Sequence, residues 1–205
     1  MDIQFLITAF VTLFVMIDPI GMTPLFIALT NGMSAAQRRL VAIRACLVAL
    51  FILTAFLLVG EVLLTGIGIT LPAFRIAGGI LLFLTAMEML FEKRTPRREG
   101  SAETDQSLEN DPSVFPLAIP LIAGPGTITA LILLAAERSD ILGLGMVWLV
   151  LVSVLAIVMT LFALSGHIAK LLGKTGMVVI TRIFGLLLAA LSVQFILDGL
   201  NIALG

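Results

Sequence analysis

The sequence is poor in the residues that carry most enzyme chemistry. Its 205 residues include one Cys, one His, one Trp and no Tyr. Cys46 has no second cysteine with which to form a disulfide within the chain, and His167 is equally solitary. Neither an HExxH zinc motif nor a GxxxxGK[ST] phosphate-binding loop is present. We therefore expect no enzymatic activity, no metal, no cofactor and no nucleotide-driven pump.

Charged residues are also scarce, at 12% of the chain, whereas 60% of the residues are hydrophobic. A membrane-spanning helix needs about 20 apolar residues to cross roughly 30 Å of hydrocarbon. The sequence offers six such stretches, at about 4–30, 40–63, 72–91, 114–136, 141–164 and 178–199. This pattern predicts an all-α polytopic membrane protein with six transmembrane helices.

The longest hydrophilic segment, residues 92–113, is rich in charge, Ser and Pro and has no apolar periodicity. It predicts a cytoplasmic linker between two halves of three spans each, residues 1–91 and 114–205. Ten of the twelve Lys and Arg residues flank the gaps after spans one, three and five, and basic residues collect on the cytoplasmic side. Both termini are therefore predicted to lie outside. The lipid bilayer is the expected partner, and nucleic acid is not.

The two halves resemble each other in the order of their residues. Pro19 aligns with Pro125 and Thr23 with Thr129 at one offset, and one further residue of shift aligns the RIAG segment from Arg75 with the RIFG segment that begins at residue 182. Because each half contains three spans, the second half must enter the membrane from the opposite side. The sequence thus predicts an inverted repeat with a pseudo-two-fold axis in the membrane plane.

Spans one and four are interrupted at matching places, by the segments DPIGMTP at residues 18–24 and AGPGTIT at residues 123–129. Proline lacks an N–H group and leaves helical carbonyls without their usual partner. In lipid, such freed groups persist only when they are buried in protein or line a polar cavity. Matched interruptions therefore indicate a transport site near the midplane. The alternative is that these prolines and glycines merely kink packed helices.

We predict that a small zwitterion binds at the two interruptions. N–H groups at the start of a half-helix can hold a carboxylate, while a carboxylate side chain, carbonyls and hydroxyls can hold an ammonium group or a coupling cation. The candidate binding residues are Asp18, Gly21, Thr23, Gly124, Gly126, Thr127 and Thr129, and the helix-breaking residues are Pro19, Pro24 and Pro125. The interruptions contain no aromatic or basic residue, which argues against a large anionic substrate.

Two further charges are predicted to be structural. Arg75 begins span three and Glu61 ends span two on the same outer face. Residues near helix ends can reach the interface, so an ion pair between these two is expected there.

The residues at the interruptions resemble hallmark segments of the MarC family. The similar segments are residues 18–24, the RIAGG segment at residues 75–79 and the GPGT segment at residues 124–127, and the likeness covers essentially the whole chain. The family comprises bacterial and archaeal inner-membrane proteins of six spans, some described as small neutral amino acid transporters. Asp18 stands where many members carry Asn ahead of the same Pro.

The expected function is that of a secondary transporter in the bacterial inner membrane, working by alternating access on small neutral amino acids or similar metabolites. A proton or a sodium ion is the candidate coupling cation, and Asp18 is either its carrier or a hydrogen-bonding residue of the site. The alternatives are a channel, or a non-transporting assembly or stress-related membrane protein that uses the broken helices for packing.

Overall fold

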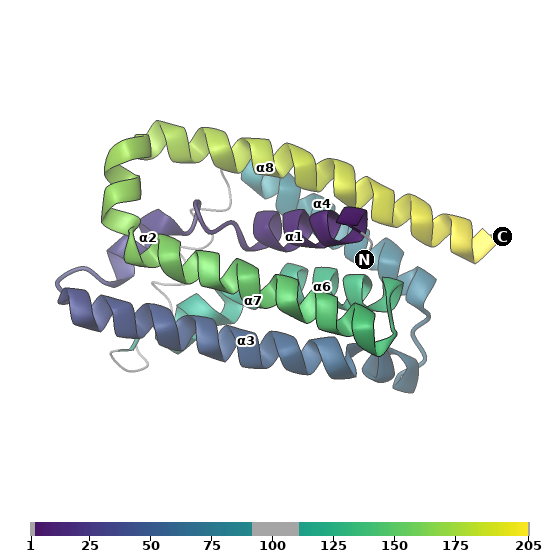
Figure 1. Ribbon diagram of the computed structural model, residues 1–205. Coiled ribbons are helices and arrows are strands. Elements are labelled where there is room, and N and C mark those ends of the chain that lie inside the picture. The colour runs from purple at the N-terminus through teal and green to yellow at the C-terminus, as the bar shows by residue number, and fades with distance from the viewer. Residues whose placement is uncertain (1–2, 92–110, 205) are drawn as a thin grey trace.

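The computed structural model describes residues 3–91 and 111–204, and all of its regular elements within these ranges are helices. In chain order they are α1 (Ile3–Ile17), α2 (Thr23–Leu29), α3 (Ala35–Gly66), α4 (Leu71–Leu90), η1 (Ser113–Ile122), α6 (Pro125–Glu137), α7 (Ile141–Ala163) and α8 (Ser165–Leu204). The long helices run lengthwise through one bundle (Figure 1). The all-α prediction is confirmed for these residues. Most of the predicted linker, residues 92–110, lies outside them.

Four of the helices are long and apolar enough to cross a membrane, namely α3, α4, α7 and the Thr175–Leu204 part of α8. Together η1 and α6 form a fifth candidate span, bent by 53° at its break. Helix α1 is apolar but has only 15 residues. It rises about 22 Å, which is less than the thickness of the hydrocarbon core. The chain is therefore an integral membrane protein with four or five candidate spans by length and composition.

Side-chain caps begin the helices α3, α4 and α7. Ser34 and Gln37 form a capping box at the start of α3, in which each side chain accepts a hydrogen bond from the other residue's backbone N–H. The side chain of Thr70 caps α4, and that of Asp140 caps α7. Gly173 interrupts α8 with a φ of 61°, a conformation that glycine adopts without steric cost.

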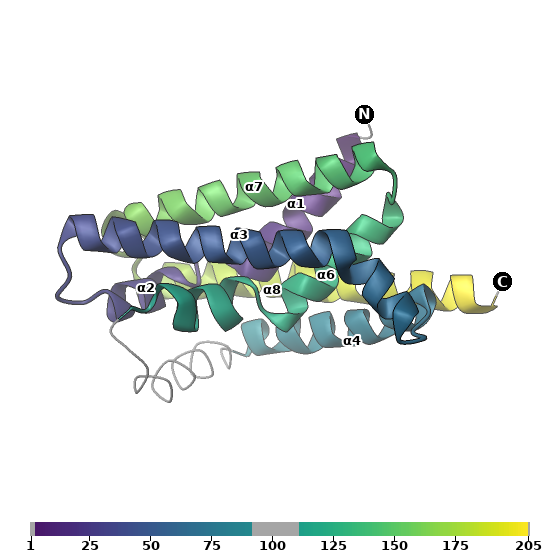
Figure 2. The ribbon, with the colours of Figure 1, turned by 90° about the horizontal axis from the view of Figure 1, so that it is seen from below.

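Helices of the first half pack against helices of the second half. Contacts join α1 to α6, α3 to α7 and α4 to α8. Figure 2 shows α3 and α7 running alongside each other. The α4–α8 pair is close, because a Cβ atom at Gly79 would lie only 2.8 Å from the carbonyl oxygen of Ser192. Small residues at a membrane helix interface permit such close backbone approach.

The start of α1 and the end of α8 lie at the same end of the bundle, opposite the α2–α3 connection (Figure 1). The end of α6 and the start of α7 lie at that end too. We call this end of the bundle the terminal end. The core between the two ends is almost wholly apolar, and the buried polar residues within it include Asp18, Thr23 and Thr127.

Candidate functional site

The first interruption separates α1 from α2 and is shaped by Asp18. This residue has a φ of 52°, a left-handed conformation that Asp and Asn adopt more readily than most residues. Its Oδ1 accepts a hydrogen bond from the Gly21 N–H at 3.1 Å, and its carbonyl oxygen accepts one from the Met22 N–H at 3.0 Å. Asp18 is only 1% exposed. Its backbone and side chain together turn the chain at the break.

Gly21 marks a close approach between this break and α8. A Cβ atom there would overlap the Asp18 carboxylate and lie 2.8 Å from Thr181 Oγ1. The absence of a side chain at Gly21 therefore places the carboxylate of Asp18 and the Thr181 hydroxyl around one point. The sequence analysis did not select Thr181, although it directly precedes the RIFG segment, which begins at Arg182.

The side chain of Thr23 gives the freed carbonyl oxygen of Pro19 a hydrogen-bond donor. The carbonyl oxygen of Pro19 would normally accept from the N–H of residue 23, but that N–H donates to Ile20 instead. The hydroxyl of Thr23 donates to the Pro19 carbonyl at 3.1 Å, and Thr23 is fully buried. Pro24 lies in the first turn of α2, where its missing N–H costs no helical hydrogen bond. The freed carbonyl thus finds a partner inside the protein, as lipid requires.

The second interruption begins earlier than the sequence analysis placed it, because η1 contains Pro116 and Pro120. Phe115 and Ile119 have extended backbone, with φ and ψ of −118° and 127° and of −127° and 126°. The residue before a proline is sterically pushed out of the helical region. The four-residue spacing of these prolines was a signal available in the sequence.

Helix α6 restarts at the Gly124-Pro125 step. Gly124 is its N-cap residue and accepts a hydrogen bond from the Ile128 N–H at 3.0 Å. A Cβ atom at Gly124 would lie 2.5 Å from the carbonyl oxygen of Pro120, so only glycine fits this turn without a shift. No side chain caps this helix start. Its first N–H groups therefore lack the side-chain oxygen that usually satisfies them.

The two threonines after this step are both buried but take different positions. Thr127 is 2% exposed in the first turn of α6. Thr129 packs against α4, where its Cγ2 lies 2.5 Å from the position of a Cβ atom at Gly78. The structure thus joins the second interruption to the RIAGG segment, and Thr129 serves that contact.

Met16 links the two interruptions. It lies two residues before Asp18 in α1, is 3% exposed, and its Cε occupies the place that a side chain at Gly126 would take. A methyl carbon of Leu82 in α4 lies 3.8 Å from the same position. Two breaks that are more than 100 residues apart in sequence are therefore neighbours, with Met16 packed between them.

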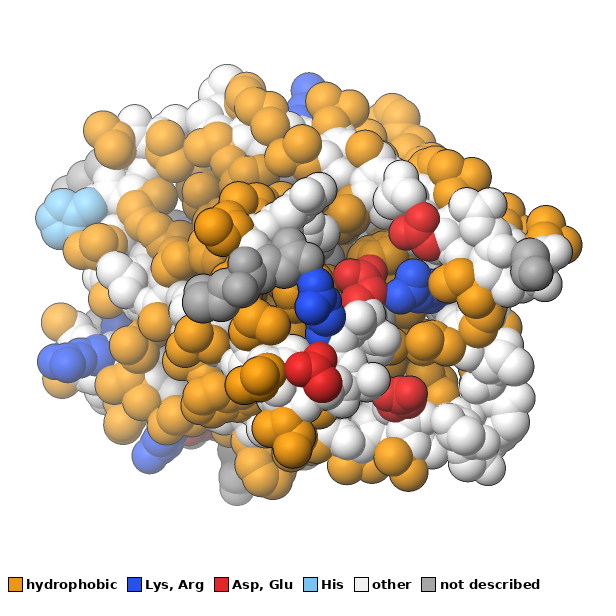
Figure 3. All heavy atoms as spheres, turned by 45° about the vertical axis from the view of Figure 1, so that its right-hand side comes forward, with side chains coloured by type: hydrophobic (Ala, Val, Ile, Leu, Met, Phe, Trp, Pro, Cys, Tyr) orange, Lys and Arg blue, Asp and Glu red, His pale blue; other side chains and the backbone are white. Residues whose placement is uncertain are grey.

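A separate charged cluster lies at the terminal end, where acidic and basic side chains surround a hollow (Figure 3). Arg75 is 8% exposed and its Nη2 lies 3.8 Å from Glu137 Oε1. Its Nε is buried without a hydrogen-bond partner. The prediction that Arg75 pairs with Glu61 is wrong. Helix α4 packs against α6 and brings Arg75 to Glu137, the last residue of that helix.

Comparisons with known proteins agree that the chain is an integral membrane protein. A family model described as "MarC family integral membrane protein" matches residues 3–204. The UPF0056 membrane protein YvbG of Bacillus subtilis (strain 168) is 39% identical over 205 residues, which cover 98% of this chain and 96% of the relative. The UPF0056 membrane protein MJ1677 of Methanocaldococcus jannaschii is 40% identical and covers 100% of both chains. No solved structure matches. The match over nearly the whole chain and these full-length relatives show that this chain belongs to the MarC family.

Proposed function

We propose that this chain is a secondary transporter of small neutral amino acids or similar small metabolites in the bacterial inner membrane. The observation that carries the proposal is the pair of interrupted helices, which meet through Met16 and Gly126. Paired helix interruptions at a repeat interface are typical of transporter binding sites.

The proposal includes six spans in two inverted repeats. In it, α1 and α2 together form the first span, and η1 and α6 form the fourth. The contacts α1–α6, α3–α7 and α4–α8 support this arrangement, because each of them joins a span to its own counterpart in the other half. A pseudo-two-fold axis in the membrane plane produces such pairings. The common position of the α1 start and the α8 end agrees with an even number of crossings. The charge bias then puts both termini outside.

The proposed substrate is a small zwitterion. The uncapped start of α6 offers N–H groups and the positive end of a helix dipole to a carboxylate. The Asp18 carboxylate and the Thr181 hydroxyl, which meet beside Gly21, offer oxygen atoms to an ammonium group or to a coupling proton or sodium ion.

Met16 blocks the proposed site in this structure and must move to open it. Its side chain covers Gly126, so a substrate reaches the start of α6 only when α1 and α6 separate or Met16 changes rotamer. Movement of one repeat against the other is the motion that alternating access requires. Methionine is suited to this position because its unbranched side chain repacks easily.

Transport in proteoliposomes tests the proposal. Purified wild type is compared with Gly126→Leu and with the matched control Gly145→Leu, since position 145 in α7 is exposed and has open space around it. We expect saturable counterflow of labelled glycine, alanine, serine or threonine in wild type and control, and loss of counterflow in Gly126→Leu. Flux that does not saturate would instead indicate a channel. No flux from folded wild type would favour the assembly or stress-related alternative.

A further inference from the structure

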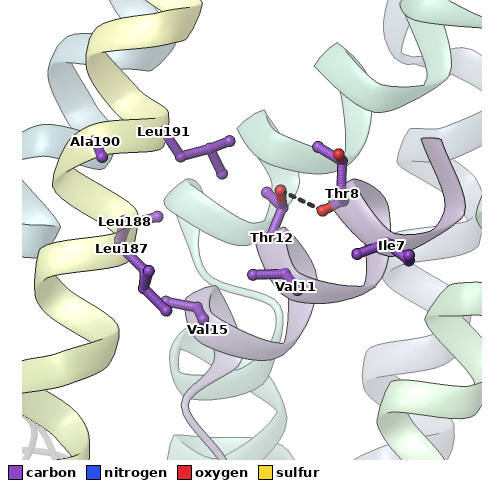
Figure 4. A pocket seen from close by; sticks show the side chains of 9 residues that line it. All are labelled: Ile7, Thr8, Val11, Thr12, Val15, Leu187, Leu188, Ala190 and Leu191. Atoms are coloured by element: carbon purple, nitrogen blue, oxygen red, sulfur yellow. Dashed lines mark hydrogen bonds between the residues drawn. The ribbon is translucent and has the colours of Figure 1, made fainter. Parts of the chain in front are cut away.

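An apolar groove of about 370 Å³ lies between α1 and α8, and no residue of the two interruptions lines it (Figure 4). Its lining residues divide into a buried floor and an exposed rim. The floor is formed by Thr12, Val15 and Leu188, and the rim by Ile7, Val11 and Leu187. The groove is therefore open on the outer surface of the bundle.

The groove offers an occupant almost no hydrogen bonding along its floor. The hydroxyl of Thr12 donates to the carbonyl oxygen of Thr8 at 2.7 Å within α1, as the dashed line in Figure 4 shows. That donor is therefore already satisfied, and the other floor side chains are hydrocarbon. A polar ligand would lose its hydration there without replacement, whereas an alkyl chain would lose nothing.

The groove continues into the charged cluster at the terminal end. Thr8 lines the groove and also a second hollow of about 360 Å³, whose other lining residues are Gln4, Phe5, Glu137 and Arg138. The Arg138 guanidinium carbon lies 5.6 Å from the centre of the Phe5 ring, and Arg75 pairs with Glu137. This second hollow thus presents a guanidinium and a carboxylate, from the neighbouring residues Arg138 and Glu137.

The depth of the two hollows matches one leaflet of a bilayer. The charged hollow is formed by the first turns of α1 and the end of α6, which places it near the interface. From Thr8 to Val15, α1 rises about 10 Å, against about 15 Å for half of a hydrocarbon core. An amphiphile with its head in the charged hollow would therefore lay most of one chain along the groove.

We propose that these two hollows together bind one zwitterionic phospholipid with a phosphoethanolamine head. One acyl chain lies in the α1–α8 groove, the phosphate contacts Arg138, and the ammonium group contacts Glu137. A phosphate with a neutral alcohol head offers Glu137 no ammonium group beside its ion pair with Arg75, so it makes one contact fewer and binds less well. Helix α1 forms one wall of this site and also carries Met16. The bound lipid therefore packs against the helix that moves in the proposed transport cycle.

Native mass spectrometry of the purified full chain in detergent tests the proposal. Equimolar phosphatidylethanolamine and phosphatidylglycerol are added to wild type, to Val11→Trp, which fills the groove, and to the matched control Val62→Trp on the exposed face of α3. We expect wild type and control to retain one phosphatidylethanolamine per chain. Val11→Trp should retain about tenfold less. Arg138→Ala should lose about tenfold in retention, as expected for a lost charge-assisted hydrogen bond.

Several results would overturn the proposal. They are no lipid retained by the wild type, equal retention by wild type and Val11→Trp, or equal retention of the two lipids by the wild type. Retention that Arg138→Ala leaves unchanged would overturn the contact between the phosphate and Arg138. A lipid-free wild-type dimer that Val11→Trp dissociates would show that a second copy covers the groove. If Val11→Trp does not fold, Ala190→Phe fills the same groove from α8 and replaces it in the comparison.

Discussion

Gly79 provides a sharp test of the packing between α4 and α8. A Cβ atom there would lie 2.8 Å from the Ser192 carbonyl oxygen and 3.2 Å from the Ile196 N, and both are backbone atoms of α8. Backbone cannot rotate away as a side chain can. Gly79→Ala therefore forces the two helices apart by roughly half an ångström, which forfeits about a quarter or more of the local dispersion energy.

The expected magnitude follows from two opposing effects. Overpacking of a well-packed interface costs about 1–3 kcal/mol, and about 2–3 kcal/mol where the clash is with backbone atoms, whereas Ala in place of Gly inside a helix gains about 1 kcal/mol. Gly79→Ala should thus lower the free energy of unfolding by about 1–2 kcal/mol. Gly145→Ala in α7 has open space around its Cβ atom. This control should raise the free energy of unfolding by about 0.5–1 kcal/mol.

Reversible unfolding in mixed detergent micelles with increasing dodecyl sulfate, followed by circular dichroism, measures both variants. The two substitutions should change stability in opposite directions, with a difference of about 1.5–3 kcal/mol. If Gly79→Ala is as stable as wild type while Gly145→Ala behaves as expected, α4 and α8 do not approach as closely as described.

Two further predictions concern carboxylates. Asp18→Asn should fold normally and retain counterflow, because Asn tolerates the φ of 52° and its Oδ1 can accept a hydrogen bond from the Gly21 N–H. The variant should lose gradient-driven accumulation of substrate. Full accumulation would disprove cation coupling through Asp18. The pKa of Asp111, which lies outside the spans, is lowered by Ser113, whose backbone N–H donates to Oδ1 at 3.0 Å, and by Arg44, whose Nη1 lies 2.7 Å from Oδ2. A lowered pKa in the folded state contributes stability above the unfolded-state pKa, near 4, which is lost as the pH falls through the folded value. Asp111→Asn should therefore lower the thermal midpoint at pH 7 by up to about 3 °C, since an exposed ion pair contributes under about 1 kcal/mol. The difference in midpoint between the variant and wild type should vanish in acid. A difference that persists at about pH 2 would contradict this cause.

Local chemistry determined much of the architecture. Long apolar runs predict membrane helices because the free energy of transferring each residue from water to lipid depends on its own side chain. The helix start at α3 follows from neighbouring residues, as Ser34 and Gln37 illustrate. The interruptions at Asp18–Pro24 and at Gly124-Pro125 were visible for the same reason, since proline removes a hydrogen bond wherever it stands. Pro116 and Pro120 carried the same local signal before the second break.

Only the tertiary structure decided which residues meet. Met16 and Gly126, Thr181 and Gly21, and Arg75 and Glu137 are each brought together by helices that are distant in sequence. Apolar runs of similar composition specify that helices form, but not which faces they present to one another. That choice depends on side-chain shape and on where small residues permit close approach. The sequence by itself therefore determined that the chain forms apolar membrane helices interrupted at proline and glycine. The packing between helices decided the surroundings of each break and the partner of Arg75.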